Sequence, residues 1–354
     1  MRMKKFIFIA AIAAMAISCA KTSERTPVRG QAIGFDTWTS NLTKSTHTPF
    51  ATGATFDVFG YKYKEEGNVK TTVFEGEDVT LNSNGSWNYT EIRFWDRTTD
   101  SYTFFAISPA GITSSAPAQT GLFTTNDITF GGKNGDILVA KKKEIVKSNY
   151  GLTVDLDFVP QAALFDLYFK KAKNLKEAEL TINSVTLKNI QTKGHLSVSE
   201  YDGTGKPVTA WTLAETPVTA NFNNTHGINS VSVPVSIETG TEHGISNAEP
   251  LIDHLIVMPQ ALLASGQQLE INYTVNFSGE SITHSRTIDL NKFDLTDMAG
   301  EGRNESDQNT APFVEAWQPG KHYTYYLTIN ADIIVFNATI SDWADANAFH
   351  YIIN

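Results

Sequence analysis

The chain has 354 residues, of which 41% are hydrophobic and 19% charged, and its formal net charge is −10. This balance is typical of a folded protein with a sizeable core and about two domains, and it excludes a largely disordered chain. The negative field also argues against nucleic acid or an anionic membrane surface as partner, because their phosphates would be repelled.

Residues 1–18 have the pattern of a bacterial lipoprotein signal peptide. Basic residues precede the apolar run Phe6–Ile17, which is too short to span a bilayer as a helix. Small residues then lead into Cys19, the only cysteine in the chain. We therefore expect Cys19 to be acylated and no disulfide to form within the chain. An ordinary secretory signal with an incidental thiol is the alternative.

Residues 19–44 contain a polar tether, a short strand and a second polar segment that holds Lys44. The predicted strand, Ala32–Trp38, turns Ile33 and Phe35 to one face. Burying such side chains stabilises a fold by about 1.5–3 kcal/mol each. Loss of this strand would therefore expose an apolar groove with unpaired backbone groups, and such an edge attracts another strand.

Beyond residue 44 the dominant signal is β structure. Apolar and polar residues alternate in Leu152–Phe158 and Leu269–Phe277, as half-buried strands require. Enrichment in β-branched and aromatic residues predicts further strands at Phe56–Tyr63, Val79–Leu81, Ile92–Trp95, Tyr102–Ile107, Ile137–Ala140, Leu180–Leu187, His195–Ser199, Val208–Leu213, Ser230–Ile237, Leu255–Met258, Ser281–Leu290, Tyr323–Ile329 and Asp332–Ile340. Gln161–Ala172 is compatible with a helix or a strand. We predict an all-β chain with two tandem antiparallel β-sandwiches, at residues 45–150 and 151–354.

The C-terminal tail is apolar on both faces of its predicted strand. Ile333 and Val335 lie on one face, and Phe336 lies on the other. Such a tail could fill a groove in a neighbouring subunit, which is the donor-strand form of β-augmentation. The alternative is that both ends of the chain complete their own sheets.

No motif in the chain predicts catalysis, a metal or a cofactor. The eight histidines do not form an H-E-x-x-H pair, and neither a G-x-S-x-G elbow nor a phosphate-binding glycine loop is present. The acidic loop Asp294–Asp307 could collect a calcium ion, but its spacing does not fit an EF-hand. The six tryptophans could stack on sugar rings, although core packing is the more common role of such residues.

Several short motifs, taken in order, resemble the fimbrillin-like (Mfa-like) lipoproteins of Bacteroidia, which are subunits of type V pili. They follow a lipobox cysteine, a short strand and a Lys or Arg before the next strand. The motifs are Phe56–Tyr61, Asp136–Ala140, Leu180–Leu187, Leu255–Gln260, Trp317–Tyr325 and Ile340–Trp343. The resemblance spans the whole chain.

This resemblance implies transthyretin-like sandwiches and export as an outer-membrane lipoprotein through Cys19. It also implies that an arginine- or lysine-specific protease cuts at Lys44 and removes the strand with Ile33, Phe35 and Trp38. The tail, with Ile333, Val335 and Phe336, would then fill the groove of another subunit. The implied partners are other fimbrillin subunits, the protease, the outer membrane and a receptor on a host or bacterial surface, and the implied location is the fimbrium at the cell surface.

Two points stay open at this stage. The family's better-known cut follows arginine, whereas lysine stands at the matching position here. The alternative function is a surface glycan-binding lipoprotein that stays anchored at Cys19 and uses exposed aromatic residues.

Overall fold

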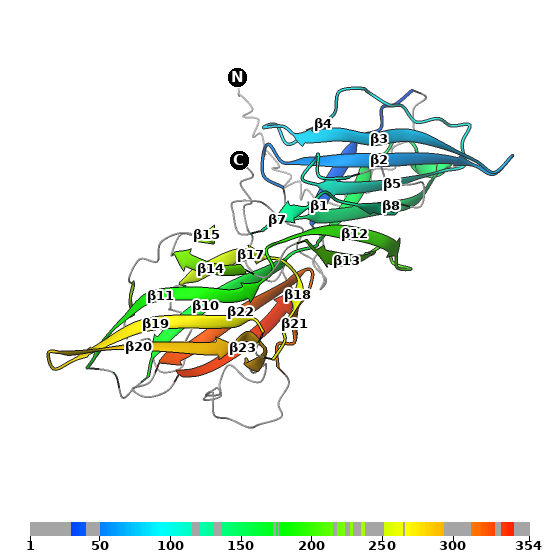
Figure 1. Ribbon diagram of the computed structural model, residues 1–354. Helices are drawn as coiled ribbons and strands as arrows, with labels where there is room; N and C mark the ends of the chain where they lie inside the picture. Colours follow the sequence, from blue (N-terminus) through cyan, green and yellow to red (C-terminus); the bar gives the residue numbers. More distant parts are fainter. Residues whose placement is uncertain are drawn as a thin grey trace, which may run out of the picture.

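The computed structural model describes the chain in thirteen ranges. They are residues 30–39, 50–114, 121–130, 136–172, 175, 177–214, 218–223, 227–228, 235–237, 251–264, 266–293, 313–329 and 334–342. The secondary structure in these ranges consists of strands together with two 3₁₀ turns, η1 (Lys147–Asn149) and η4 (Leu290–Lys292). The all-β prediction is confirmed, and Figure 1 shows two bodies of strands arranged end to end.

The first body is built on a seven-stranded sheet of order β1-β9-β8-β5-β2-β3-β4. Its strands are β1 (Phe35–Thr39), β2 (Thr55–Lys64), β3 (Val69–Leu81), β4 (Trp87–Asn88), β5 (Ser101–Ser108), β8 (Leu138–Val146) and β9 (Val154–Pro160). The sheet curves until its first strand packs over its middle strands, where the rings of Phe35 and Phe56 lie 5.9 Å apart. The apolar core inside this curve includes Val58, Phe104 and Leu156.

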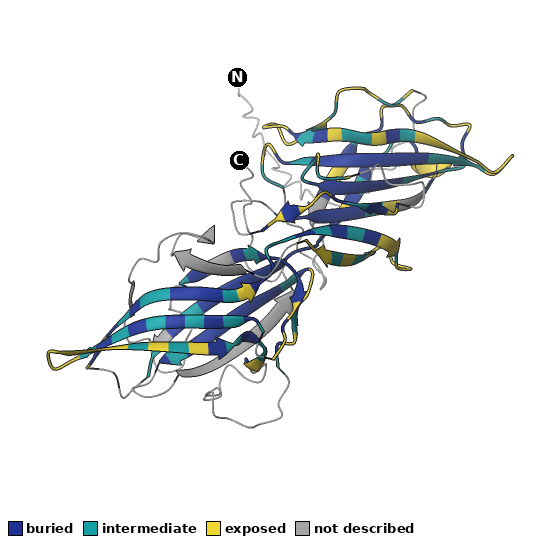
Figure 2. Cartoon of the chain, viewed as in Figure 1, coloured by how far each residue is buried: buried dark blue, intermediate teal, exposed yellow. Residues whose placement is uncertain are grey.

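A small sheet covers the outer face of this curved sheet. It contains β6 (Phe123–Thr124), β7 (Ile128–Thr129), β12 (Lys193–Tyr201) and β13 (Pro207–Leu213). Leu196 and Val198 of β12 pack with Phe105 and Val139 of the curved sheet. Since both of their faces are covered, β2 and β5 are dark blue along most of their length in Figure 2.

The second body is a sandwich of two sheets. One has the order β17-β10-β22-β23, and the other has the order β15-β14-β11-β19-β20 with β16 paired to β11. The strands are β10 (Ala163–Lys171), β11 (Glu179–Ile190), β14 (Val218–Asn223), β15 (Gly227–Ile228), β16 (Val235–Ile237), β17 (Ile252–Val257), β19 (Gln268–Phe277), β20 (Glu280–Asp289), β22 (Lys321–Ile329) and β23 (Ile334–Asp342), and β18 (Gln260–Ala261) pairs with β21 (Ala316–Trp317). Strand β19 is buried at every second residue, as its alternating sequence predicts.

The structure differs from the predicted sandwiches in three respects. Pairs β1–β9 and β10–β22 run parallel, since each pair is joined by a long connection rather than a hairpin. The first body also extends to Pro160, beyond residue 150, because β9 pairs with β1 and β8. Finally, β12 and β13 leave the second body and pack on the first. Gln161–Ala172, which we left open between helix and strand, contains β10.

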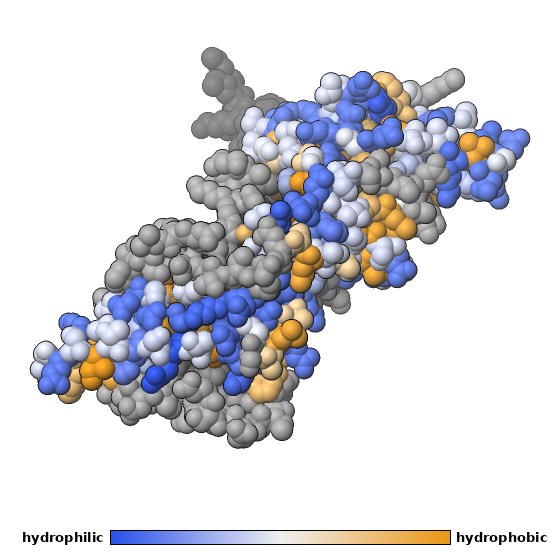
Figure 3. All heavy atoms as spheres, viewed as in Figure 1, coloured by the Kyte–Doolittle hydropathy of each residue, from blue (hydrophilic) through white to orange (hydrophobic). Residues whose placement is uncertain are grey.

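The surface drawn in Figure 3 is mainly hydrophilic over the described residues, with separate apolar patches. One patch lies at the free end of the β19–β20 hairpin, where Phe277 and Ile282 are each 57% exposed.

Asp136 is a buried carboxyl group where the two bodies meet. One of its oxygens accepts a hydrogen bond from the Ala162 backbone N–H at 3.3 Å, and the other has no partner among the described residues. Burial raises the pKa of Asp136 well above its usual value, although the N–H groups of Ala162 and Ile137 oppose this. Because the folded-state pKa is the higher one, ionisation destabilises the fold as pH rises above the unfolded value.

We expect Asp136→Asn to increase the free energy of unfolding at neutral pH by roughly 1–3 kcal/mol, because the amide keeps an acceptor without burying a charge. The gain should shrink at acidic pH, where Asp136 is protonated in both states. Asp202→Asn is the control, since turn hydrogen bonds lower the pKa of exposed Asp202 and its ionised form is the favoured one. Thermal unfolding across pH measures both, and a loss of stability in Asp136→Asn at pH 7 would contradict the assignment.

Candidate functional site

The first strand is seated with one face in the core and the other in solvent. Ile33, Phe35 and Thr37 are 1%, 6% and 8% exposed, whereas the intervening Asp36 is exposed. This alternation places Ile33 and Phe35 on one face, as their spacing predicts. Trp38 lies opposite Asp157 of β9 in the backbone register.

The side chain of Phe35 is surrounded by four aromatic rings. The rings of Phe56, Phe74, Tyr89 and Phe104 surround it at centroid distances of 5.6–5.9 Å, all approached edge to face. Aromatic pairs prefer this geometry and gain about 0.5–1.5 kcal/mol beyond the area they bury. Since these rings come from β2, β3, β5 and the segment after β4, one side chain of β1 joins four parts of the first body.

The backbone on and before β1 pairs with two segments that are far apart in sequence. Strand β1 runs parallel to β9, and the Val154 N–H donates to the Gly34 carbonyl at 2.8 Å. The preceding residues run antiparallel to residues 93–95, where the Ile33 N–H donates to the Arg93 carbonyl at 2.8 Å. The Tyr89 hydroxyl also donates to the Ile33 carbonyl at 2.7 Å. Removal of β1 would leave backbone groups on both segments without partners.

Two features make the fit of β1 imperfect. The hydroxyl of Thr37 is buried with no hydrogen-bond partner among the described residues, which costs about 1–3 kcal/mol. On the outer face, Asp36 lies directly opposite Asp155 of β9, and like charges in such a position are destabilising. Burial raises the pKa of Asp155, Lys142 lowers it, and Asp36 raises it further.

The structure describes part of the remaining predicted site. Cys19, Lys44, Ile333 and the acidic loop Asp294–Asp307 lie outside the described residues. Downstream of Lys44, the chain is described again from Phe50, whose ring packs against Phe158 and Trp87 of the first body at 5.2 and 5.4 Å.

Val335 and Phe336 lie in β23, at the edge of the second sandwich. Within the described ranges β23 pairs with β22 alone, over the nine residues Ile334–Asp342. The register opposes Phe336 to the core residue Leu327, and Val335 to Thr328.

The described ranges of the chain hold no cluster of side chains that could bind a metal ion. No three His, Cys, Asp or Glu side chains in these ranges come together as a metal site. The buried hydrogen bond between His322 Nε2 and Asp166 Oδ2, at 2.9 Å, joins β10 to β22. We also find no helical segment in these ranges with the length and hydropathy of a membrane span.

Sequence reasoning missed the partners of β1. The strand predicted at Ile92–Trp95 signalled that residues 93–95 were extended, but no pattern tied them to Ile33. Tyr89 and the opposed pair of Asp36 and Asp155 carried no signal at all, because their roles depend on the register of distant strands.

A family profile, a curated relative and a solved structure all relate this chain to fimbrial proteins. The sequence profile of a family described as fimbrillin-like matches residues 43–343. Fimbrium subunit Fim1C of Phocaeicola vulgatus is 31% identical over 145 residues, which are 38% of this chain and 36% of that relative. The match thus spans about a third of the relative's length. A fimbrial protein from Bacteroides vulgatus ATCC 8482 shares the fold, with a TM-score of 0.54 at 17% identity over 88% of this chain and 99% of that one.

Proposed function

The chain belongs to the fimbrillin-like family, and from this we propose that it is a pilus subunit that polymerises by exchanging its first strand for a strand of another subunit. As a fimbrillin-like fimbrial subunit it acts in cell-surface fimbriae. In the proposal, Cys19 anchors the exported chain to the outer membrane and a protease cuts after Lys44. Strand β1 then leaves, and the tail of the next subunit enters its place.

This proposal rests on the buried position of the Phe35 side chain among aromatic rings. Phe35 lies in the aromatic core of the first body, yet its strand is outside the region that the family profile matches, which begins at residue 43. Strand β1 packs in the core of the first body but lies outside the part of the chain that the family profile matches. Both properties are expected of a strand that is removed from the mature subunit. The anchored ring of Phe50 supports a cut at Lys44, because the chain downstream of the cut is held by the body.

The tail has the pattern needed to replace β1. Ile334, Phe336, Ala338 and Ile340 alternate with other residues in the sequence of β23, as the apolar face of a strand requires. A donor that places one of these residues in the position of Thr37 would bury no unpaired hydroxyl, and it would not set a carboxylate against Asp155. The incoming strand would therefore bind better than the strand it replaces.

Substitution of Lys44 tests the proposal. In cells producing Lys44→Gln we expect a surface protein that keeps its N-terminal segment and forms no pili, whereas the wild type yields a mature chain starting at Ser45. The measurement combines mass spectrometry of the N-terminus with electron microscopy of the cell surface.

Arg29→Gln is the matched control. Arg29 precedes β1, so a cut there leaves the strand in place and its loss should not affect assembly. Normal pili built from Lys44→Gln chains that still contain residues 32–38 would contradict strand removal.

A further inference from the structure

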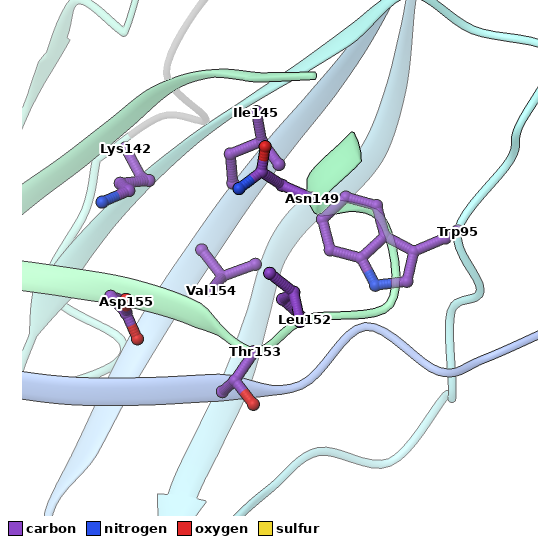
Figure 4. Close-up of a pocket in the computed structure, with 8 residues that line it drawn as sticks. All are labelled: Trp95, Lys142, Ile145, Asn149, Leu152, Thr153, Val154 and Asp155. Atoms are coloured by element: carbon purple, nitrogen blue, oxygen red, sulfur yellow. The ribbon is translucent and has the colours of Figure 1, made fainter. Parts of the chain in front are cut away.

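Strands β8 and β9 separate within the first sheet. They pair only where Leu138–Ala140 meets Phe158–Pro160. Beyond that point β8 stays paired with β5, while the first part of β9 stays paired with β1. The turn η1 and the residues after it bridge the open end, and a pocket of about 190 Å³ lies between the two strands (Figure 4).

The pocket combines a buried apolar lining with an exposed polar rim. Trp95, Ile145 and Val154 are buried, and Leu152 is half-buried beside them. The polar residues Lys142, Asn149, Thr153 and Asp155 are exposed or half-buried. Figure 4 shows Lys142 and Asp155 at one end of the pocket and Asn149 above Leu152, nearer Trp95.

Trp95 forms a rigid wall of the pocket. Its ring stacks on Tyr150 at 5.1 Å with an interplanar angle of 14°, and Tyr102 packs edge-on at 4.9 Å. These contacts fix the ring in place. The indole Nε1–H is buried without a hydrogen-bond partner among the described residues. The wall is thus preorganised.

The charges of the rim decide which ligand class fits. Lys142 supplies a cation and Asp155 an anion, so a simple anion would face a carboxylate and a simple cation would face an ammonium. Asn149 and Thr153 both donate and accept hydrogen bonds. Hydroxyl groups do the same, so a neutral polyol satisfies every member of the rim at once.

The size of the pocket limits the size of the ligand. Its volume is about 190 Å³, so we expect a small ligand such as one sugar ring. A sugar ring has an apolar C–H face and a hydroxyl edge, which match the lining and the rim respectively. We propose that this pocket binds a single neutral saccharide unit.

Saturation-transfer difference NMR on the uncut chain, which retains β1, tests this proposal with the methyl glycosides of glucose, galactose, mannose and N-acetylglucosamine. We expect transfer to the ring protons of at least one glycoside. Asp155→Asn should weaken its binding about tenfold, the effect of losing one charged hydrogen bond. This variant should fold normally, because it also removes the repulsion between Asp155 and Asp36.

Two further variants separate this site from unspecific binding. Asn149→Trp places a large side chain on an exposed turn at the mouth and should abolish transfer. Asp157→Asn alters an exposed carboxylate on the same strand outside the pocket and should leave binding unchanged. Absence of transfer to all four glycosides, or equal binding by wild type and Asn149→Trp, would overturn the proposal. Because this test uses the uncut chain, neither result says whether β1 is later removed and replaced.

Discussion

Replacing Phe35 with alanine is expected to lower the free energy of unfolding of the first body by about 3–5 kcal/mol, the usual cost of removing a buried phenylalanine. The effect should lie toward the upper end of this range, because four rings lose their common neighbour. Denaturant unfolding of the uncut chain, in which residues 30–44 are still present, measures the change.

Asp36→Ala is the matched control on the same strand. Its side chain is exposed, and its loss removes both the repulsion with Asp155 and one hydrogen bond from the Thr37 N–H. We expect the free energy of unfolding to change by no more than about 0.5 kcal/mol. A loss below about 1 kcal/mol for Phe35→Ala would show that β1 is not part of the core, which would remove the basis for a groove.

The alternation of apolar residues predicted the inner face of the first strand and the all-β class. Ile33 and Phe35 are two residues apart, and the structure buries both. The same rule identified β19, which is buried at every second residue. Such predictions succeed because the direction of a side chain from a strand is a local property of the backbone.

Which strand lies next to which could not be predicted in the same way. Nothing in residues 35–39 indicates a parallel partner at 154–158, and the alternation in β12 shows an apolar face without showing which sheet it covers. These arrangements depend on contacts between residues more than a hundred positions apart or between separate bodies. The opposed aspartates, the Tyr89 hydrogen bond and the pocket between β8 and β9 all follow from them.

A disulfide across β1 and β9 should block assembly without blocking proteolysis. Asp36 and Asp155 are opposed neighbours in adjacent strands, whose spacing of about 4.8 Å is compatible with a disulfide. In Asp36→Cys/Asp155→Cys we expect the segment cut at Lys44 to stay attached to the body through the new bond, and no pili to form. Gels run with and without reductant show the attachment, and electron microscopy shows the assembly.

Reduction of this variant is what separates strand departure from every other step. Export and the cut are complete before reductant is added, so recovery of polymers on reduction can come only from release of β1. The double variant Asp36→Ser/Asp155→Ser is the control, because it loses the same charges but cannot form the bond, and it should assemble without reductant. Polymers formed by the oxidised variant with β1 still attached would mean that Phe35 stays packed among its four aromatic neighbours during assembly. The subunits would then have to join through another surface, and β1 would be a permanent strand of the first body.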